Sequence, residues 1–158
     1  MDSEVFVCLC IIFIIAVLVL PFVQTADVKK KITGLANNAL EVTPEEFFKI
    51  RNASIGGRGN MHISTKYDFA GVYILYNYSK NMYYVGQGKK VFQRVNCHFT
   101  GHGNGDVYAD YKYGDSFTIT MIALENSGFD TLNELERNTI KTYNAYSKGY
   151  NKTRGNRG

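Results

Sequence analysis

The hydrophobic pattern in the later part of the chain switches between the period of strands and the period of helices. Residues 70–78 and 82–86 are rich in Val, Ile and Tyr and flank a polar turn at residues 79–81, which predicts a β-hairpin. In residues 89–99 apolar side chains recur at helical spacing, so this stretch predicts a helix. Alternating apolar and polar positions over residues 116–124 predict a third strand.

Helix-start signals complete this pattern. Thr131 and Glu134 form a capping-box pattern that opens a helix running to about Tyr143. The segment at residues 43–46, with a capping Thr, then Pro and two acids, predicts another short helix, and a further one is expected near residues 107–112. The chain therefore predicts an α+β fold in which helices flank a small three-stranded sheet, antiparallel or mixed.

An uncharged run of nineteen residues, 5–23, occupies the start of the chain. At 1.5 Å per residue such a helix reaches about 28 Å, close to the roughly 30 Å hydrocarbon core of a bilayer. The run predicts one transmembrane helix before the α+β domain, with a buried core helix and a cleaved secretory signal as alternatives. Lys29, Lys30 and Lys31 follow the run and no base precedes it. We therefore expect a single-pass cell-membrane protein, held in the lipid bilayer, whose C-terminal part is cytoplasmic.

Three parts result: an anchor at residues 1–26, a connector with a short helix at residues 27–66, and a domain at residues 67–158. A chain of 158 residues is too short for a large multidomain enzyme, and 45% hydrophobic content excludes wholesale disorder. The net charge of +4 becomes +6 once the anchor, with two acids and no base, is set aside. Residues 141–158 hold five bases and no acid, which indicates a polyanionic partner, with a solvated tail as the alternative.

Three polar side chains lie on or beside apolar helix faces. Glu136 shares a face of the last predicted helix with Leu132 and Ile140. A carboxylate at this position is either a partner in a partly buried ion pair or a ligand for a divalent cation, as phosphate chemistry often requires. Arg94 and His98 lie one turn apart on an earlier predicted helix, beside its apolar stripe. On spacing alone, these two are more typical of a helix surface than of a catalytic site.

Two triplets, Gly71-Val72-Tyr73 and Tyr84-Val85-Gly86, are separated by ten residues. They resemble the paired signature of the GIY-YIG nucleases, with Val in place of Ile in both triplets. Later segments follow in the family's order: residues 93–99 resemble its Arg-bearing helix, residues 135–141 its acidic helix, and residues 149–151 its closing Asn motif. The resemblance covers the whole predicted domain and implies the GIY-YIG fold and nuclease activity.

The resemblance also implies roles for individual side chains. Tyr73 would deprotonate the attacking water, and Tyr84 would help to orient it. Arg94 would bind the scissile phosphate, His98 would assist proton transfer or phosphate contact, and Glu136 would hold one Mg²⁺ or Mn²⁺ ion. The family often carries a lysine directly after the second triplet, where this chain has glutamine. The candidate substrate-binding residues are Lys89, Lys90, Asn151, Lys152 and Arg154.

A register condition decides whether the two tyrosines act together. Because side chains alternate across a strand, Tyr73 and Tyr84 share a face of the hairpin only if the numbers of paired residues sum to an odd value. A turn centred on Lys80 would give an even sum and separate them, and the sequence leaves both registers open.

Together these features predict a membrane-tethered, metal-dependent endonuclease that hydrolyses double-stranded DNA, with incoming or mobile DNA as its target. We expect low sequence selectivity, because no separate recognition domain is visible and phosphate contacts would then dominate binding. The alternative is a catalytically inactive DNA-binding or membrane adaptor module that retains the fold. The oligomeric state is left open.

Overall fold

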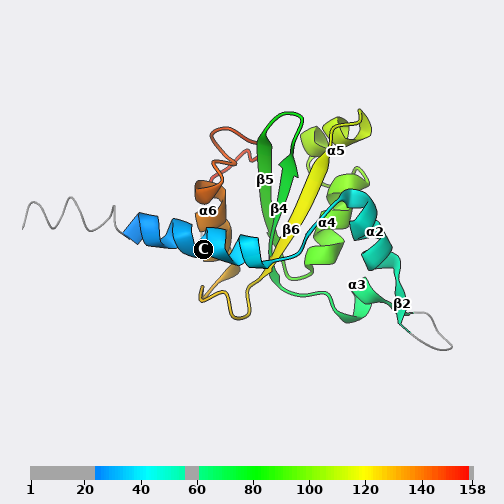
Figure 1. Ribbon diagram of the computed structural model, residues 1–158, viewed down its shortest axis with the longest axis horizontal. Helices are drawn as coiled ribbons and strands as arrows, with labels where there is room; N and C mark the ends of the chain where they lie inside the picture. The colour runs from blue at the N-terminus through cyan, green and yellow to red at the C-terminus, as the bar shows by residue number, and fades with distance from the viewer. Residues whose placement is uncertain (1–23, 56–60, 157–158) are drawn as a thin grey trace, which may run out of the picture.

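A computed structural model describes residues 24–55 and 61–156, and its centre is an antiparallel sheet of four strands in the order β1-β6-β4-β5 (Figure 1). The strands of this sheet are β1 (Glu41–Val42), β4 (Gly71–Asn77), β5 (Met82–Gly88) and β6 (Phe117–Ala123). A separate two-stranded sheet pairs β2 (Ser54–Ile55) with β3 (Met61–His62). The helices are residues 24–38, α2 (Pro44–Asn52), α3 (Ile63–Lys66), α4 (Val91–Phe99), α5 (Gly105–Lys112) and α6 (Leu132–Thr142).

The β4–β5 hairpin settles the register of the two tyrosines. Tyr73 pairs with Gly86, and Leu75 pairs with Tyr84, so the numbers of paired residues have an odd sum. The connecting turn takes four residues, 78–81, rather than the three expected from the polar segment alone. Tyr73 and Tyr84 therefore project from the same face of the sheet, at neighbouring positions on its β5 edge.

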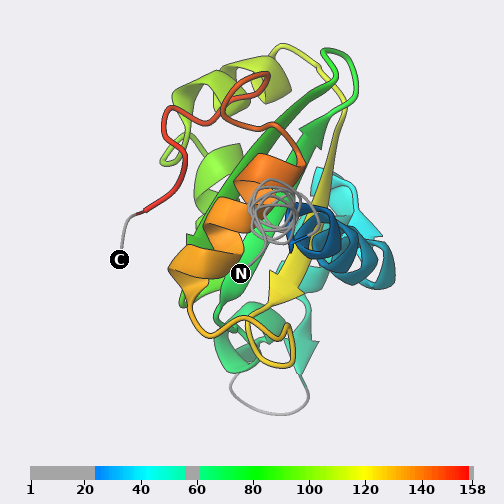
Figure 2. The same cartoon turned by 90° about the vertical axis from the view of Figure 1, so that its left-hand side faces the viewer.

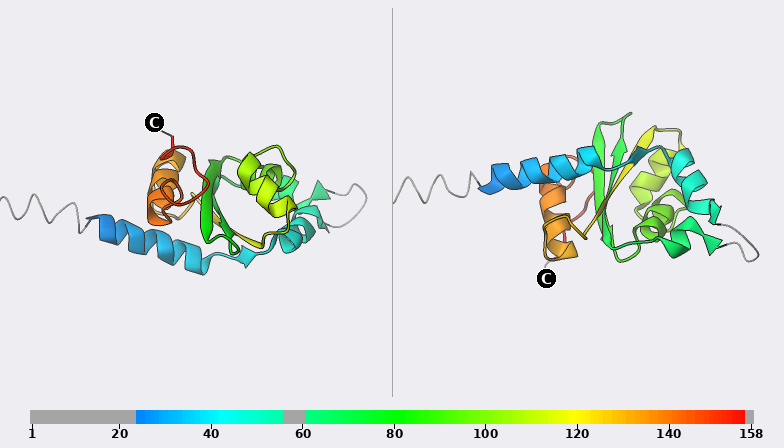
Figure 3. Two further views of the ribbon diagram at one scale, coloured as in Figure 1. Left: turned by 90° about the horizontal axis from the view of Figure 1, so that it is seen from above. Right: turned by 60° about the horizontal axis from the view of Figure 1, so that its bottom comes forward.

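Each face of the sheet is covered by its own helices and has its own core (Figures 1 and 3). On one face, Tyr73 and Leu75 pack with Phe47 of α2 and with Val91, Val95 and Phe99 of α4. The other face, with Val72, Ile74 and Val85, packs against helix 24–38 and α6 through Ile32, Leu135 and Ile140. The alternation of β4 side chains thus assigns α4 and α6 to opposite sides of the same strand.

The predicted three-stranded sheet is wrong in its number of strands. Glu41 and Val42 pair with Thr120 and Ile119 of β6 and add the fourth strand, β1, and the sheet is antiparallel throughout. A two-residue strand has too few positions to show an alternating pattern, so its pairing is determined by the free edge of β6 rather than by local sequence. The segment expected to be a connector thus supplies one strand to the central sheet.

The predicted transmembrane helix is also not part of the observed fold. Among the residues that the structure describes, no helix is long and apolar enough to cross a bilayer. The predicted span, residues 5–23, lies outside the described residues. The fold class is therefore corrected to α+β with a four-stranded antiparallel sheet.

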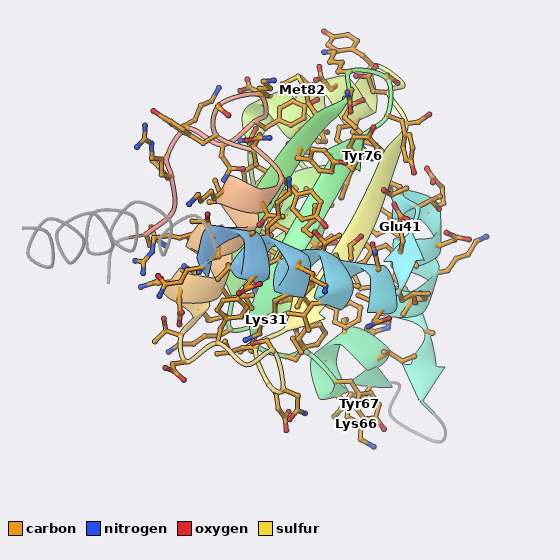
Figure 4. All side chains as sticks on the ribbon, turned by 60° about the vertical axis from the view of Figure 1, so that its left-hand side comes forward. Lys31, Glu41, Lys66, Tyr67, Tyr76 and Met82 are labelled. Carbon is orange, nitrogen blue, oxygen red and sulfur yellow. The ribbon has the colours of Figure 1, made fainter. Side chains whose placement is uncertain are left out.

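Helix 24–38 packs along the sheet, over the β6 side of the α6 face (Figure 2). Its Ile32 side chain is fully buried, which contributes about 1.5–3 kcal/mol to stability. Lys31, labelled in Figure 4, donates a 2.5 Å hydrogen bond to the carbonyl of Gly128 and lies 4.3 Å from the ring centroid of Phe129. These contacts attach the helix to the loop between β6 and α6.

The predicted helix starts at Thr43 and Thr131 are found at the N-caps of α2 and α6. In α2 the Thr43 side chain accepts from the Glu46 N–H, and the Glu46 carboxylate accepts from the Thr43 N–H, forming a complete capping box. In α6 the Thr131 hydroxyl accepts from the Glu134 N–H as expected. The Glu134 carboxylate, however, accepts from the N–H of Asp130 instead of that of Thr131.

Candidate active site

Tyr73 lies at the floor of a cleft beside the outer strand of the sheet. Its side chain is fully buried, and its hydroxyl lies over Gly86, where an added Cβ would come within 2.3 Å of the phenolic oxygen. The absence of a side chain at Gly86 is therefore what leaves room for the Tyr73 hydroxyl. The last glycine of the second triplet and the tyrosine of the first triplet thus form one structural unit.

His98 lies behind Tyr73, and the hydrogen bonds identify its tautomer. The backbone N–H of Asn104 donates to His98 Nδ1 at 2.9 Å, so Nδ1 is an unprotonated acceptor. In the neutral imidazole the proton then resides on Nε2, which lies 2.9 Å from the Tyr73 hydroxyl. His98 accordingly donates to the Tyr73 oxygen, which favours the phenolate form of the tyrosine.

Burial, together with the smaller effect of the positive charge of Arg94, lowers the pKa of His98 from its ordinary 6.5 to about 4. The imidazole is therefore neutral near neutral pH, in agreement with the tautomer that the hydrogen bonds require. Gly103 maintains this arrangement, because a Cβ there would approach Nδ1 to 2.6 Å. His98 is a buried hydrogen-bond donor to Tyr73 rather than a proton acceptor.

This lowered pKa predicts a pH dependence of stability. The unfolded chain binds a proton at His98 near pH 6.5 and the folded chain only near pH 4, so the unfolded state is favoured as the pH falls through this window. The His98 contribution to the free energy of unfolding should be complete above pH 6.5, and on the order of 3 kcal/mol should be lost by pH 4. The free energy of unfolding, measured with urea between pH 4 and pH 6.5, should change clearly less with pH in His98→Gln than in the wild type. The same pH dependence in both proteins would contradict the lowered pKa of His98.

Arg94 and Tyr84 complete this side of the cleft. Arg94 projects from α4 with its aliphatic stem packed over Gly88, where an added Cβ would lie 2.6 Å from the Arg94 Cγ. The ring centroids of Tyr73 and Tyr84 are 6.2 Å apart.

The carboxylate of Asp68 accepts from the backbone N–H groups of Phe92 and Gln93 and so fixes the N-terminus of α4. A residue that precedes β4 thereby sets the position of the arginine.

The two tyrosines have raised pKa values. Burial raises the pKa of Tyr73 well above its ordinary value of 10, and the neighbouring Tyr84 raises it further. Burial likewise raises the pKa of Tyr84. The Arg94 guanidinium lowers the pKa of both phenols, so its positive charge favours their ionised forms.

Glu136 reaches the same cleft from α6, on the opposite face of the sheet. It is only 7% exposed, yet among the described residues no basic nitrogen lies within 4.0 Å of its carboxylate. Its Oε2 accepts from the Gln87 side chain at 3.0 Å and from the Asn156 backbone N–H at 3.1 Å. The Gln87 amide also donates to Asn133 at 2.6 Å, which holds it in place. The ion-pair alternative for Glu136 is therefore not found in this part of the chain.

The four side chains line one cleft of about 300 Å³ at the β5 edge of the sheet. Tyr73 and Tyr84 come from the hairpin, Arg94 from α4 and Glu136 from α6. α4 and α6 cover opposite faces of the sheet, so side chains from both helices can meet only at an edge of the sheet. The edge that they share is β5. The remaining lining comes from residues 151–153 and from Gly86, Gln87, Asn104 and Asn156.

The segment that follows α6 returns to the free edge of β5 (Figure 2), and Asn151 attaches it there. Its side-chain oxygen accepts from the Val85 N–H at 2.8 Å, and its side-chain nitrogen donates to the Val85 carbonyl at 2.7 Å. The amide therefore replaces the partner that a further strand would supply. Since both of its polar atoms are engaged, Asn151 supports the backbone beside Tyr84, although it also lines the cleft.

Replacing Asn151 with alanine should destabilise the domain. The Val85 N–H and carbonyl would lose their partners in a partly buried position, which costs about 1–3 kcal/mol. Asn138→Ala is the matched control, because the Asn138 side chain donates to the Glu134 carbonyl of its own helix and, in the described part of the chain, to no other group. The free energy of unfolding, measured with urea, should fall clearly more in the first variant. If the free energy of unfolding fell equally in both variants, the two hydrogen bonds to Val85 would contribute no more than the hydrogen bond of Asn138 within its own helix.

The other predicted substrate-binding residues lie in three different places. Lys152 lines the cleft and also forms a 2.5 Å ion pair with Asp106. Lys89 and Lys90 are exposed near the start of α4 and are not among the residues that line the cleft. Arg154 lines a separate groove over α6. Tyr73, Tyr84, Arg94 and Glu136 thus converge, while the predicted basic residues do so only in part.

Sequence reasoning did not assign roles to Gln87, Asn104 or Asn156, each of which orients a site residue. Two of the three act through backbone N–H groups, which every residue other than proline carries, so no residue-type signal could identify them. Gln87 was visible as a departure from the usual lysine. Its uncharged amide donates to Glu136 without adding a positive charge beside the carboxylate.

The geometry at Glu136 fits a divalent cation that keeps most of its water. Oε2 is occupied by two N–H donors, whereas among the described residues no hydrogen bond reaches Oε1. No group of three or more His, Cys, Asp or Glu side chains suited to a metal exists in the described ranges. Mg²⁺ commonly binds through one or two carboxylates, several waters and substrate phosphates, so a single free carboxylate oxygen is a suitable anchor.

A comparison with protein families agrees with this constellation. The family model described as the GIY-YIG catalytic domain matches residues 69–151, just over half of the chain. The chain belongs to the GIY-YIG family. The match spans the hairpin, α4, α6 and Asn151, and it implies a nuclease-type function for the domain. No curated protein and no solved structure gave a match.

Proposed function

We propose that the GIY-YIG domain is a metal-dependent endonuclease that hydrolyses phosphodiester bonds of double-stranded DNA. The observation that carries the proposal is the convergence of Tyr73, Tyr84, Arg94 and Glu136, from the four elements β4, β5, α4 and α6, on one cleft. A module that only bound DNA would have no use for a buried carboxylate such as Glu136, which has no cationic partner within residues 24–55 and 61–156. Burying such a charge is costly unless a ligand compensates it.

In this proposal Tyr73 takes the proton of the attacking water. The oxygen of that water forms a bond with phosphorus, and the bridging P–O bond on the opposite side breaks. Tyr73 requires stabilisation of its phenolate, which His98 supplies through its Nε2–H at 2.9 Å and Arg94 through its positive charge. Tyr84 lies beside Tyr73 on the same face and orients the water.

Arg94 also binds the scissile phosphate, since its guanidinium presents paired N–H donors that match the nonbridging oxygens. Glu136, whose carboxylate is oriented by Gln87 and Asn156, would hold a Mg²⁺ or Mn²⁺ ion. A divalent cation bound there would stabilise the negative charge that develops on the phosphate and on the leaving oxygen. Arg94 comes from α4 and Glu136 from α6, so the guanidinium and a cation bound at Glu136 would act on the phosphate from the two faces of the sheet.

We propose low sequence selectivity for this activity. The basic side chains that line the cleft, Arg94 and Lys152, suit phosphate oxygens, and phosphate contacts position a protein on DNA without reading base edges. Binding should therefore weaken as the salt concentration rises, for every DNA sequence alike.

The proposal is tested by incubating the purified full-length chain with a labelled duplex in Mg²⁺ and, in parallel, in EDTA. We expect cleavage at many positions along the duplex in Mg²⁺ and no cleavage in EDTA. Binding of an intact duplex under both conditions would instead support the inactive DNA-binding module and overturn the proposed hydrolysis.

A further inference from the structure

Outside the catalytic cleft, a second groove of about 460 Å³ runs over the outer face of α6. Three cationic side chains line it: Arg137 and Lys141 of α6, and Arg154 of the segment that follows. Tyr146 forms part of the opposite wall. None of the described residues that line this groove is acidic. We refer to it below as the α6 groove.

The cations of the α6 groove are not neutralised by the protein. All three are exposed, and within residues 24–55 and 61–156 no carboxylate oxygen lies within 4.0 Å of their nitrogens. Arg137 donates to the backbone carbonyl of Asn156 at 3.0 Å, and the Arg154 guanidinium lies 5.4 Å from the Tyr146 ring centroid. Both contacts orient a guanidinium while leaving its charge intact.

The α6 groove adjoins the catalytic cleft. Lys152, Thr153 and Asn156 line the cleft, whereas Arg154 of the same short segment lines the groove. Arg137 follows Glu136 directly on α6. The Glu136 carboxylate therefore lines the cleft, and the Arg137 guanidinium, on the adjacent side of the helix, lines the groove. A polyanion leaving the cleft over residues 152–156 therefore enters the groove.

We propose that the α6 groove binds the sugar–phosphate backbone of the duplex that the cleft cuts, at phosphates beyond the scissile one. Arg137 and Lys141, one helical turn apart, contact one strand, and Arg154 contacts it from the other wall. The groove is concave, which admits a phosphate strand but not a flat lipid surface. This inference rests on the proposed function, because the substrate is the same duplex.

The test measures binding of a short fluorescent duplex to the full-length chain in EDTA over a series of salt concentrations. Each phosphate contact contributes about 0.9 to the slope of log affinity against log salt. The triple variant Arg137→Gln, Lys141→Gln, Arg154→Gln should therefore bind more weakly, with a slope shallower by about 2.7. Lys141→Gln alone, at an exposed position, should make the slope shallower by about 0.9 without any demand on folding.

A matched control removes the same charge elsewhere. Lys49, Lys66 and Lys112 are exposed on α2, α3 and α5, away from the α6 face of the sheet. Changing these three to glutamine should leave affinity and slope close to those of the wild type. If the groove and control variants lost the same affinity for the duplex, the loss would come from net charge alone, and the inference would be overturned.

Two further measurements separate the possible outcomes. Binding to phosphatidylserine vesicles through the three groove residues, with unchanged duplex binding, would identify a lipid partner and overturn the inference. If the triple groove variant bound the duplex with wild-type affinity and still cleaved it in Mg²⁺, the inference would also be overturned. The proposed function would then stand. Duplex binding through the groove without any cleavage would support the groove and contradict the proposed function alone.

Discussion

Replacing Tyr73 with phenylalanine should slow DNA cleavage by about 100- to 10,000-fold, the range of general acid–base contributions. The substitution removes the hydroxyl that accepts the proton of the attacking water and keeps the ring that fills the core. The buried hydrogen bond to His98 is lost with the hydroxyl. The variant should therefore remain folded and bind duplex DNA like the wild type. Single-turnover rates on a labelled duplex, with thermal unfolding of the same samples, measure both effects.

Tyr150→Phe is the matched control. The Tyr150 hydroxyl is also hydrogen-bonded, to Asp110 and Asn77, but lies outside the cleft lining. Its loss should reduce stability by about 1–2 kcal/mol and leave the cleavage rate unchanged. Because burial raises the pKa of Tyr73, the wild-type rate should rise about tenfold per pH unit above neutrality, and this rise should disappear in Tyr73→Phe. A Tyr73→Phe rate equal to that of the wild type would remove the tyrosine from the mechanism.

Glu136→Gln should abolish metal-dependent cleavage with little cost in stability. A bound cation contributes several kcal/mol of charge stabilisation in the transition state, so losing it should slow cleavage by at least about 100-fold. Glutamine has the same shape and still accepts hydrogen bonds from Gln87 and Asn156. Removal of a buried carboxylate that has no cationic partner among the described residues should leave the unfolding temperature unchanged or raised.

The matched control on the same helix is Glu134→Gln. Glu134 lies on α6 outside the cleft lining, and among the described residues its carboxylate accepts from the Asp130 N–H alone. Mg²⁺ should raise the unfolding temperature of the wild type and of Glu134→Gln, but not that of Glu136→Gln, since a ligand that binds only the folded state stabilises it. Stabilisation of all three proteins by Mg²⁺ would place the ion elsewhere.

Local sequence signals predicted the long elements of the fold, because each signal acts within one segment. The β4–β5 hairpin, α4, β6 and α6 have alternating or helical apolar positions long enough to identify them. The register of the hairpin could not be predicted, because a three-residue and a four-residue turn fit the same polar stretch. β1 and the packing of helix 24–38 depend on contacts far along the chain, at β6 and Phe129, which no local pattern encodes.

The candidate site divides in the same way. The motif order predicted the side chains that converge on the cleft, since Tyr73, Tyr84, Arg94 and Glu136 carry distinctive chemistry. The groups that orient them could not be predicted, because they act through backbone N–H groups and through the outer edge of β5. The direction of the His98 hydrogen bond is the clearest case, since it follows from the Asn104 N–H contact and not from any residue type.

The most direct test of the central claim is the rate at which the full-length chain cleaves a supercoiled plasmid as Mg²⁺ is titrated, beside Glu136→Gln under the same conditions. If the cleft is a metal-dependent phosphodiesterase with Glu136 as its anchor, the wild-type rate should rise with Mg²⁺ and saturate. The variant should stay near the background rate throughout. Equal cleavage by the two proteins, or a wild-type rate that does not depend on Mg²⁺, would contradict the claim.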